Sequence, residues 1–421
     1  MLQILKNIFN IPAAFQSTQY RIYWLGAFAS VSGYNLTYFA QLWLIHQIND
    51  STLFLGLVGA ANAAPSFILT LIGGAYADRV NKKLIMISSQ IILAGLVIIM
   101  ALLTIFEVVE IWHILVIAVI AGSVSAFDLP SRQAFYPELV NEKSLTSAVA
   151  MNASIWQSVR IIAPAVAGFL IALTSTSVVF IFSAVGFTMM AVLLLPLTGI
   201  SKEDGDDQSQ TKLTDQVKDS LKYVFKKPEF RYLIGLAMFS SFFGGSYILL
   251  MPIFAVDIFS VGAQGQGVLL ACSGVGSVLA SLFIATRKIV LPSGTFILIA
   301  CCLSGISIAI FGLLAEVTGS YTLGIVLMLT TGFFTSLHMI STMAALQQMV
   351  PSELRGRVMA LYGINWSLML LGGVQAGLIG LALGAPFTVM LGGILVAALS
   401  VIFIFANKEF VQIGQKAKGI N

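Results

Sequence analysis

Charged residues are scarce in this sequence. Only 10% of its 421 residues are Asp, Glu, Lys or Arg, whereas 58% are hydrophobic, and the mean hydropathy is +0.95. A soluble globular domain carries about 25% charged residues. The composition therefore excludes a soluble domain and predicts a chain that lies largely within a lipid bilayer.

Catalytic motifs are also missing. The sequence has no HExxH pair, no Walker phosphate loop and no nucleophile elbow. Its cysteines, Cys272, Cys301 and Cys302, lie in apolar stretches without the spacing of metal ligands, which predicts packing roles. We therefore expect no enzyme activity, no metal and no cofactor. Without ATP hydrolysis, any transport has to draw on an ion gradient or on the gradient of the substrate itself.

Long apolar runs dominate what is present. A membrane-spanning helix needs about 20 apolar residues, and twelve stretches meet that length. The sequence therefore predicts an all-α membrane protein with twelve transmembrane helices. The expected spans are 22–47, 53–77, 84–106, 111–135, 146–173, 176–199, 231–256, 266–286, 290–315, 320–346, 357–382 and 386–406.

The loops between these spans differ in charge. When residue 1 is placed in the cytoplasm, every Lys and Arg except Arg160 falls at the cytoplasmic side or in a cytoplasmic loop. The outer side carries only acids: Asp50, Glu107, Glu110, Asp257 and Glu316. Positive residues mark the cytoplasmic side of membrane proteins, so both termini are predicted to be cytoplasmic. The net charge of +4 then reports orientation in the membrane and requires no nucleic-acid partner.

The loop after the second span carries the most specific motif. It reads GGAYADRVNKK over Gly73–Lys83 and resembles the signature G-x-x-x-D-R-x-G-R-[RK] of major facilitator superfamily transporters. Asn81 replaces the usual glycine and Lys82 the usual arginine. The resemblance implies the major facilitator fold, with two six-helix bundles that alternate access to a site between them.

A second motif narrows the resemblance. FDLPSRQAFYPELV ends span four, and span five then carries a basic residue and a proline. This combination resembles enterobactin-exporter-like and macrolide-efflux-like carriers, the transmembrane secretion effectors. Part of it recurs, since Pro137 and Pro351 lie 214 residues apart, as two parallel repeats require. We expect bundles at 1–200 and 229–421, joined by a cytoplasmic linker at 201–228 that contains an amphipathic helix.

The resemblance also implies a gate at the cytoplasmic side. Asp78 is expected to face the start of span eleven near Gly356, where helix-end amides favour an anion. Lys82 and Asp128 would complete a charge relay that closes this side. The alternative is a hairpin that only anchors the topology. The candidate gating residues are Gly74, Asp78, Arg79, Lys82, Asp128, Arg132 and Gly356.

Polar side chains within the spans are candidates for substrate or ion contacts, because lipid penalises them. Hydrogen bonding between helices is the alternative for each of them, and it is the favoured one for His338. His46 lies near the outer end of span one and is interpreted as an interfacial histidine. The candidates are Tyr34, Asn35, Tyr38, Gln41, Tyr247, His338, Asn365 and Trp366.

Arg160 is the only Lys or Arg predicted to lie well inside the hydrocarbon. A cation there costs at least about 2.5 kcal/mol, so something must offset its charge. One candidate is Asp128 on the adjacent span, and the other is an anionic or oxygen-rich substrate. The sequence leaves both open.

The resemblance implies a secondary active transporter of a bacterial inner membrane. The favoured substrate is an amphipathic small molecule, a siderophore or drug, exported by proton antiport. The alternatives are an uptake carrier, a lysophospholipid transporter, or a membrane sensor that does not transport. The expected partners are the substrate, the lipid bilayer and a proton or other ion gradient, and the chain is expected to be a monomer.

Overall fold

The computed structural model of the chain describes residues 12–77, 80–198, 226–286, 294–351, 358–359, 361–406 and 408–411, and these residues contain helices and no strand. The predicted all-α class is therefore confirmed. The first-half helices are α2 (Thr18–Ile48), α3 (Thr52–Ala77), α4 (Lys82–Ile105), α5 (Ile111–Phe135), α6 (Leu145–Leu173) and α7 (Thr176–Leu194), with short 3-10 turns η1 (Ala13–Gln16), η2 (Tyr136–Leu139) and η3 (Glu142–Ser144).

The second half follows the same plan. Its elements are α9 (Pro228–Gly244), α10 (Tyr247–Ile253), the π-helical turn η4 (Phe254–Ile258), α11 (Gly262–Thr286), α12 (Gly294–Thr318), α13 (Tyr321–Met349), α15 (Asn365–Leu383), α16 (Ala385–Ala406) and α17 (Lys408–Val411). Among the described residues, eleven segments are long and apolar enough to cross a membrane, and α2, which is more polar, has the length for a twelfth with its 31 residues. The predicted linker at 201–228 lies almost wholly outside the described residues.

Local capping explains several helix starts. The Ser17 side chain accepts a hydrogen bond from the Tyr20 amide at the start of α2. Asn81 does the same for α4, accepting from the amides of Lys83 and Leu84. Asparagine is among the best N-cap residues, so the departure from glycine in the signature loop gives this helix a side-chain cap.

Three local predictions need correction or refinement. The fourth span, α5, runs through Pro130 and ends at Phe135, just before the 3-10 turn η2 that contains Pro137. The eighth span begins at Gly262 and not at residue 266, because the glycine-rich run 262–267 is already part of the helix. The seventh span is interrupted at Gly245 and Ser246, between α9 and α10.

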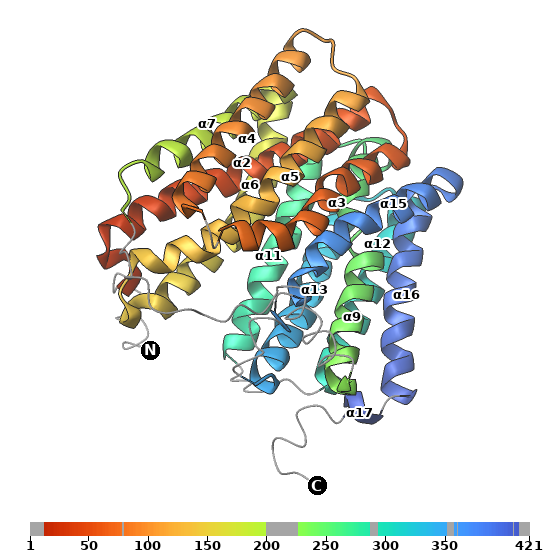
Figure 1. Cartoon of the computed structure of the whole chain (residues 1–421). Coiled ribbons are helices and arrows are strands. Elements are labelled where there is room, and N and C mark those ends of the chain that lie inside the picture. The colour runs from red at the N-terminus through yellow and green to blue at the C-terminus, as the bar shows by residue number, and fades with distance from the viewer. Residues whose placement is uncertain are drawn as a thin grey trace, which may run out of the picture.

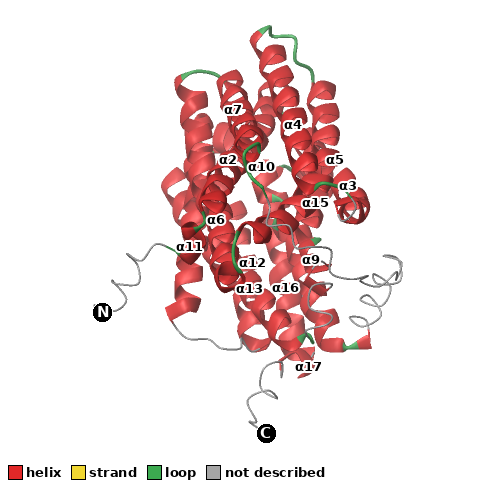
Figure 2. Ribbon diagram, turned by 60° about the vertical axis from the view of Figure 1, so that its left-hand side comes forward, coloured by secondary structure: helices red, strands yellow, loops and turns green. Residues whose placement is uncertain are grey.

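The two halves lie side by side and join through two helix pairs. Figure 1 shows α2, α4, α5 and α7 on the upper left, and α9, α12 and α16 on the lower right. Between them α3 packs on α15 and α6 packs on α11. Figure 2 shows the same bundle from a second direction. This is the predicted arrangement of two six-helix bundles.

The ends of the bundle differ in charge, as the sequence predicted. We call the end that carries Lys82, Lys83, Arg132 and Arg231 the basic end. The opposite end carries Asp50, Glu107, Glu110, Asp257 and Glu316 in or beside its helix ends and turns, and we call it the acidic end.

Close helix contact joins the halves towards the acidic end. A Cβ atom on Gly56 of α3 would clash with the Gly373 carbonyl of α15, and one on Gly168 of α6 would clash with the Ala263 carbonyl of α11. Small residues permit such backbone approach in membranes. The Thr52 hydroxyl also donates a 2.8 Å hydrogen bond to the Gly377 carbonyl.

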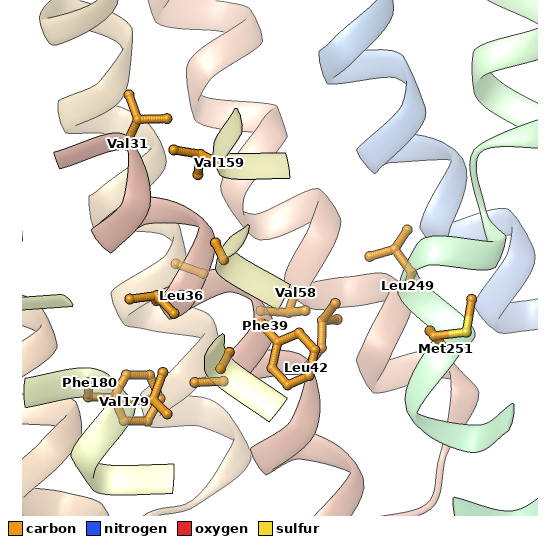
Figure 3. Close-up of a cluster of buried hydrophobic side chains, with 14 of the residues drawn as sticks. Val31, Leu36, Phe39, Leu42, Val58, Val159, Val179, Phe180, Leu249 and Met251 are labelled. Carbon is orange, nitrogen blue, oxygen red and sulfur yellow. The ribbon is translucent and has the colours of Figure 1, made fainter. Parts of the chain in front are cut away.

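A buried apolar cluster continues across this contact. It includes Leu42 and Val58 of the first half together with Leu249 and Met251 of the second (Figure 3). Between described residues, the only hydrogen bond and the only ion pair recorded across the halves lie at the acidic end. In this structure the two halves are therefore joined at the acidic end.

Candidate functional site

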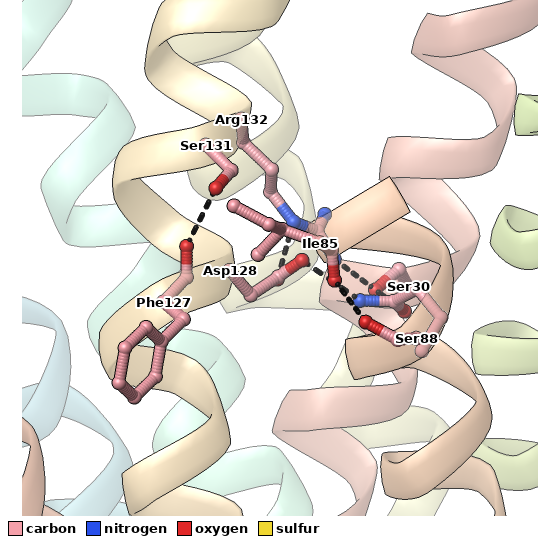
Figure 4. Close-up of polar contacts among 8 residues, drawn as sticks. Ser30, Ile85, Ser88, Phe127, Asp128, Ser131 and Arg132 are labelled. Carbon is pink, nitrogen blue, oxygen red and sulfur yellow. Dashed lines mark hydrogen bonds and ion pairs between the residues drawn. The ribbon is translucent and has the colours of Figure 1, made fainter. Parts of the chain in front are cut away.

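A closed ring of hydrogen bonds ties three helices together near the basic end of the first half (Figure 4). The Arg132 guanidinium donates to Asp128 Oδ2 at 2.6 Å and to Ser30 Oγ at 2.7 Å. Ser30 donates to Gln90 Oε1 at 2.8 Å, and Gln90 Nε2 donates to Asp128 Oδ1 at 3.2 Å. The ring joins α2, α4 and α5, so it fixes their relative positions.

The ring is buried, with side-chain exposure of only 6% for Asp128 and 11% for Arg132. A buried charge is tolerated when it is paired and its remaining donors and acceptors are bonded. Both carboxylate oxygens of Asp128 have such partners. Asp128 and Arg132 are one helical turn apart, and the i,i+4 spacing brings their side chains onto one face.

The neighbouring lysines have separate partners. Lys82 Nζ lies 2.5 Å from Glu138 Oε1 of η2. Lys83 Nζ donates to the carbonyls of Leu195 and Leu197, just beyond the last turn of α7. In this conformation Lys82 pairs with Glu138, and Asp128 pairs with Arg132 and Gln90; the predicted relay concerns the conformation with the basic ends closed and stays a prediction. Cations at a helix C-terminus are favourable, so Lys83 also stabilises the end of α7.

Part of the predicted gate cannot be placed. Asp78, Arg79 and Gly356 lie outside the described residues, and Gly74 falls in α3 where only the backbone is described. Their gating role stays a prediction. It concerns the conformation in which the basic ends of the two halves meet.

The polar face of the first span points into its own bundle. Tyr34, Thr37, Tyr38 and Gln41 line a cavity of about 20 Å³ together with Asn62 of α3 and apolar residues of α4, α5 and α7. Such a volume holds about one water molecule. Asn35 instead donates a 2.9 Å hydrogen bond to the Val31 carbonyl of its own helix. These residues lie within one half, away from the α3–α15 and α6–α11 contacts.

The polar candidates of the second half are mostly buried in it. His338 Nε2 lies 2.9 Å from Ser240 Oγ, between α13 and α9. The Tyr247 hydroxyl lies 3.4 Å from Ser273 Oγ of α11. The Asn365 amide is buried with no hydrogen-bond partner among the described residues. Hydrogen bonding within the bundle accounts for the Tyr247 hydroxyl and for Nε2 of His338, whereas His338 Nδ1 is buried with no hydrogen-bond partner among the described residues.

Arg160 and Trp366 differ from these residues. Arg160 lies near the middle of α6 and is partly exposed, and Trp366, at the start of α15, is 54% exposed. No hydrogen bond or ion pair joins the Arg160 guanidinium to a described residue. Asp128, the predicted structural partner, is bonded to Arg132 and Gln90. In this conformation Arg160 therefore does not form the ion pair with Asp128 that the first of the two accounts predicts.

Arg160 and Trp366 occupy equivalent places on the two contacts between the halves. Towards the basic end, the last described glycine of α11 that lies close to α6 is Gly274, which faces Ile161 and the Arg160 carbonyl. On the other contact, the last glycine of α3 with a described position is Gly59, which faces the Leu370 carbonyl one turn from Trp366. Both side chains thus lie where the close contact of the halves ends. The exposed Trp156 lies one helical turn from Arg160.

Several participants were not predicted. Ser30, Gln90 and Glu138 complete the contacts of Asp128, Arg132 and Lys82. Ser30 and Gln90 could have been found as polar residues in apolar spans, but nothing in the sequence pairs them. Among the described residues, no cluster of three or more His, Cys, Asp or Glu side chains could hold a metal ion.

Twelve helices in two joined halves define a membrane carrier of the major facilitator fold. Residues 11–416 match the family described as "transmembrane secretion effector". The chain belongs to that family, within the major facilitator superfamily, and is a transporter and not an enzyme.

Relatives of known name support this assignment. The chain is 24% identical over 370 residues to the staphyloferrin A transporter of Staphylococcus aureus (strain NCTC 8325 / PS 47), covering 87% of this chain and 91% of that protein. It is 21% identical over 397 residues to macrolide efflux protein A of Streptococcus pyogenes, covering 91% and 95%.

A solved structure supports the fold. A bacterial homologue of the human lysosomal transporter Spinster, in an inward-facing and occupied conformation, superposes with a TM-score of 0.72. The identity is 14%, over 96% of this chain and 99% of that chain. At this identity the likeness concerns the fold alone.

Proposed function

We propose that this transporter exports an amphipathic small molecule, a siderophore or drug, by alternating access coupled to proton antiport. The named relatives handle a siderophore and macrolides, and the family description refers to secretion. The charge difference between the two ends supports an orientation with the basic end and both termini in the cytoplasm of a bacterium. The structure then corresponds to a carrier closed on the outside.

The observation that carries this proposal is the position of Arg160. Carrier sites lie near the middle of the membrane, between the two halves, and Arg160 lies near the middle of α6, beside the contact with α11. Its charge has no recorded partner among the described side chains, and the cost of a cation at this depth has to be offset. An anionic or oxygen-rich group of the substrate would provide that partner.

Two exposed tryptophans would suit an amphipathic molecule. Trp156 lies one helical turn from Arg160, and Trp366 lies on the other half, one turn from the contact of Gly59 with Leu370. Aromatic side chains bury large apolar areas, whereas arginine binds planar oxygen pairs with two parallel hydrogen bonds. Together they would hold a ligand that has one apolar and one oxygen-rich side.

Binding measurements test this assignment. Purified protein is titrated with staphyloferrin A and, separately, with a macrolide. Arg160→Ala should fold and bind the preferred probe at least about tenfold more weakly, and Arg160→Lys should also bind weakly because lysine lacks the planar fork. Arg21→Ala is the matched control, since Arg21 is exposed and bonded to Thr18. Unchanged binding and transport by Arg160→Ala would rule out the substrate contact.

The direction of transport and its coupling to protons are tested in cells. Cells with and without the gene are loaded with each probe, and accumulation is followed with and without a protonophore. Export by proton antiport predicts lower accumulation when the gene is present, and loss of that difference when the protonophore is added. Higher accumulation in cells with the gene would establish an uptake carrier instead.

A further inference from the structure

One pair of charged groups joins the two halves at the acidic end. His46, in the last turn of α2, has its Nε2 3.6 Å from Asp257 Oδ1 of η4. Its Nδ1 lies 3.8 Å from Asp50 Oδ1, just beyond the same helix. We propose that these three side chains form a proton-binding site in which protonated His46 holds the acidic ends of the two halves together. The proposal rests on the alternating-access function proposed above.

The geometry favours the protonated ring. Each ring nitrogen of His46 lies within ion-pair distance of a carboxylate oxygen, at 3.6 and 3.8 Å, although both distances are too long for a hydrogen bond. A neutral imidazole has one N–H, so one of its nitrogens presents a lone pair to a carboxylate. The imidazolium carries a positive charge and an N–H at both nitrogens. One bound proton therefore changes the contact from partly repulsive to attractive at both sides.

The different exposures of the three side chains give a proton a path from the solution to the His46 ring. The His46 side chain is 4% exposed, whereas Asp257 is 46% and Asp50 84% exposed. The two carboxylates thus lie between the buried ring and the solution at the acidic end. The same end also has Glu107, Glu110, His113 and Glu316, none of which forms a recorded ion pair with His46.

The backbone of the second half is irregular at this point. Asp257 lies in η4, a single π-helical turn that follows Pro252. Single π-turns occur frequently at functional sites. The Phe259 amide bonds to the Phe254 carbonyl and the Val261 amide to the Ala255 carbonyl, so the turn has defined hydrogen bonds. The turn presents the Asp257 carboxylate to α2 of the other half.

The two carboxylates have different consequences for the transport cycle. Asp50 belongs to the same half as His46, so its attraction persists when the halves separate at the acidic end. Asp257 belongs to the other half, so its attraction is lost. A ligand shifts a conformational equilibrium only by its differential affinity for the two states. Protonation of His46 therefore favours the conformation with the acidic ends joined.

This preference suits an exporter driven by external protons. After substrate release, the carrier has to close its outer side before it can reload from the cytoplasm. Acid outside the cell would protonate His46 and favour that closure. For an exposed partner such as Asp257, an ion pair contributes up to about 1 kcal/mol, which corresponds to about a fivefold change in the ratio of closed to open molecules.

A distance measurement tests the site without substrate or gradient. Spin labels at Val108 and Val317, which are exposed at the acidic ends of the two halves, report their separation in nanodiscs. The native cysteines are replaced in all samples. Lowering the pH from about 8 to about 5.5 spans the usual titration range of histidine, and it should raise the ratio of the short-distance to the long-distance population by up to about fivefold.

Variants identify the responsible groups. His46→Gln and Asp257→Asn should each remove the response to pH. His113→Gln and His338→Gln, which replace the only other histidines of the chain, should keep it. Asp50→Asn should keep the response, because Asp50 belongs to the same half as His46 and its attraction is the same in both conformations.

Three outcomes would overturn the proposal: no response in the unmodified protein, a shift to longer distance in acid, or a full response in folded His46→Gln or Asp257→Asn. Because the measurement contains no substrate, failure to bind or export the probes leaves its result unaffected. The two proposals can therefore fail independently.

Discussion

The buried ring of Ser30, Gln90, Asp128 and Arg132 gives the sharpest stability prediction. Asp128→Ala removes the carboxylate and leaves the Arg132 guanidinium bonded only to Ser30. Removing one partner of a buried ion pair costs about 3–5 kcal/mol. Because Arg132 is still 11% exposed, and a long side chain can extend towards water, we expect the lower limit of about 3 kcal/mol.

Arg132→Ala should cost a similar amount, since Asp128 would keep only the Gln90 amide as a partner. The double variant Asp128→Ala/Arg132→Ala removes both charges, so it should cost clearly less than the sum of the single variants. Residues in one ionic network couple by about 0.5–3 kcal/mol, and we expect a value near about 2 kcal/mol.

The assay is the free energy of unfolding in bicelles, measured by steric trapping. The pair Lys82–Glu138 is a matched control from the same end of the first half. Its side chains are 30% and 33% exposed, so Lys82→Ala should cost less than about 1 kcal/mol. A loss below about 1 kcal/mol for Asp128→Ala, or strict additivity in the double variant, would refute the ring as a stabilising unit.

Three further predictions concern the transport cycle and the topology. Gly56→Ala should disfavour the conformation with joined acidic ends by about 1–3 kcal/mol and slow transport, because the added Cβ would clash with the backbone of α15. Gly95→Ala is the control and should leave the transport rate unchanged, since no atom lies within 4 Å of its Cβ. Equal transport rates for the two variants would contradict the contact. Cysteines at Ser209 and Ser320 should be labelled from opposite sides of the membrane, and labelling of Ser209 from outside intact cells would contradict the orientation. Asp78→Asn should insert and fold, lose transport and populate the conformation with open basic ends, whereas full transport would exclude the relay.

The sequence alone determined the helices and their class. Twelve apolar runs predicted twelve helices, and most boundaries agree within a few residues, for example 111–135 for α5 and 176–194 against the expected 176–199 for α7. Length and hydropathy suffice here because each helix satisfies its own backbone hydrogen bonds within lipid. The signature loop also identified the superfamily, since its motif is local.

The partners of the polar side chains required the tertiary structure. Asp128 and Arg132 are close in sequence, but Ser30 and Gln90 reach them only because α2, α4 and α5 pack together. In this conformation Lys82 contacts Glu138, a partner that the sequence did not indicate. A polar residue in an apolar run indicates that some partner is needed, but its identity depends on helix rotation and register.

The same limit applies to the contacts between the halves. His46 looked like an interfacial histidine because its own helix offers only Asp50 nearby, and Asp257 lies more than two hundred positions away in the chain. Arg160 had two possible partners until Asp128 was found bonded elsewhere. Sequence thus determines properties that one helix carries by itself. Charge pairing across helices depends on distances of a few ångströms, which only packing of the whole chain decides.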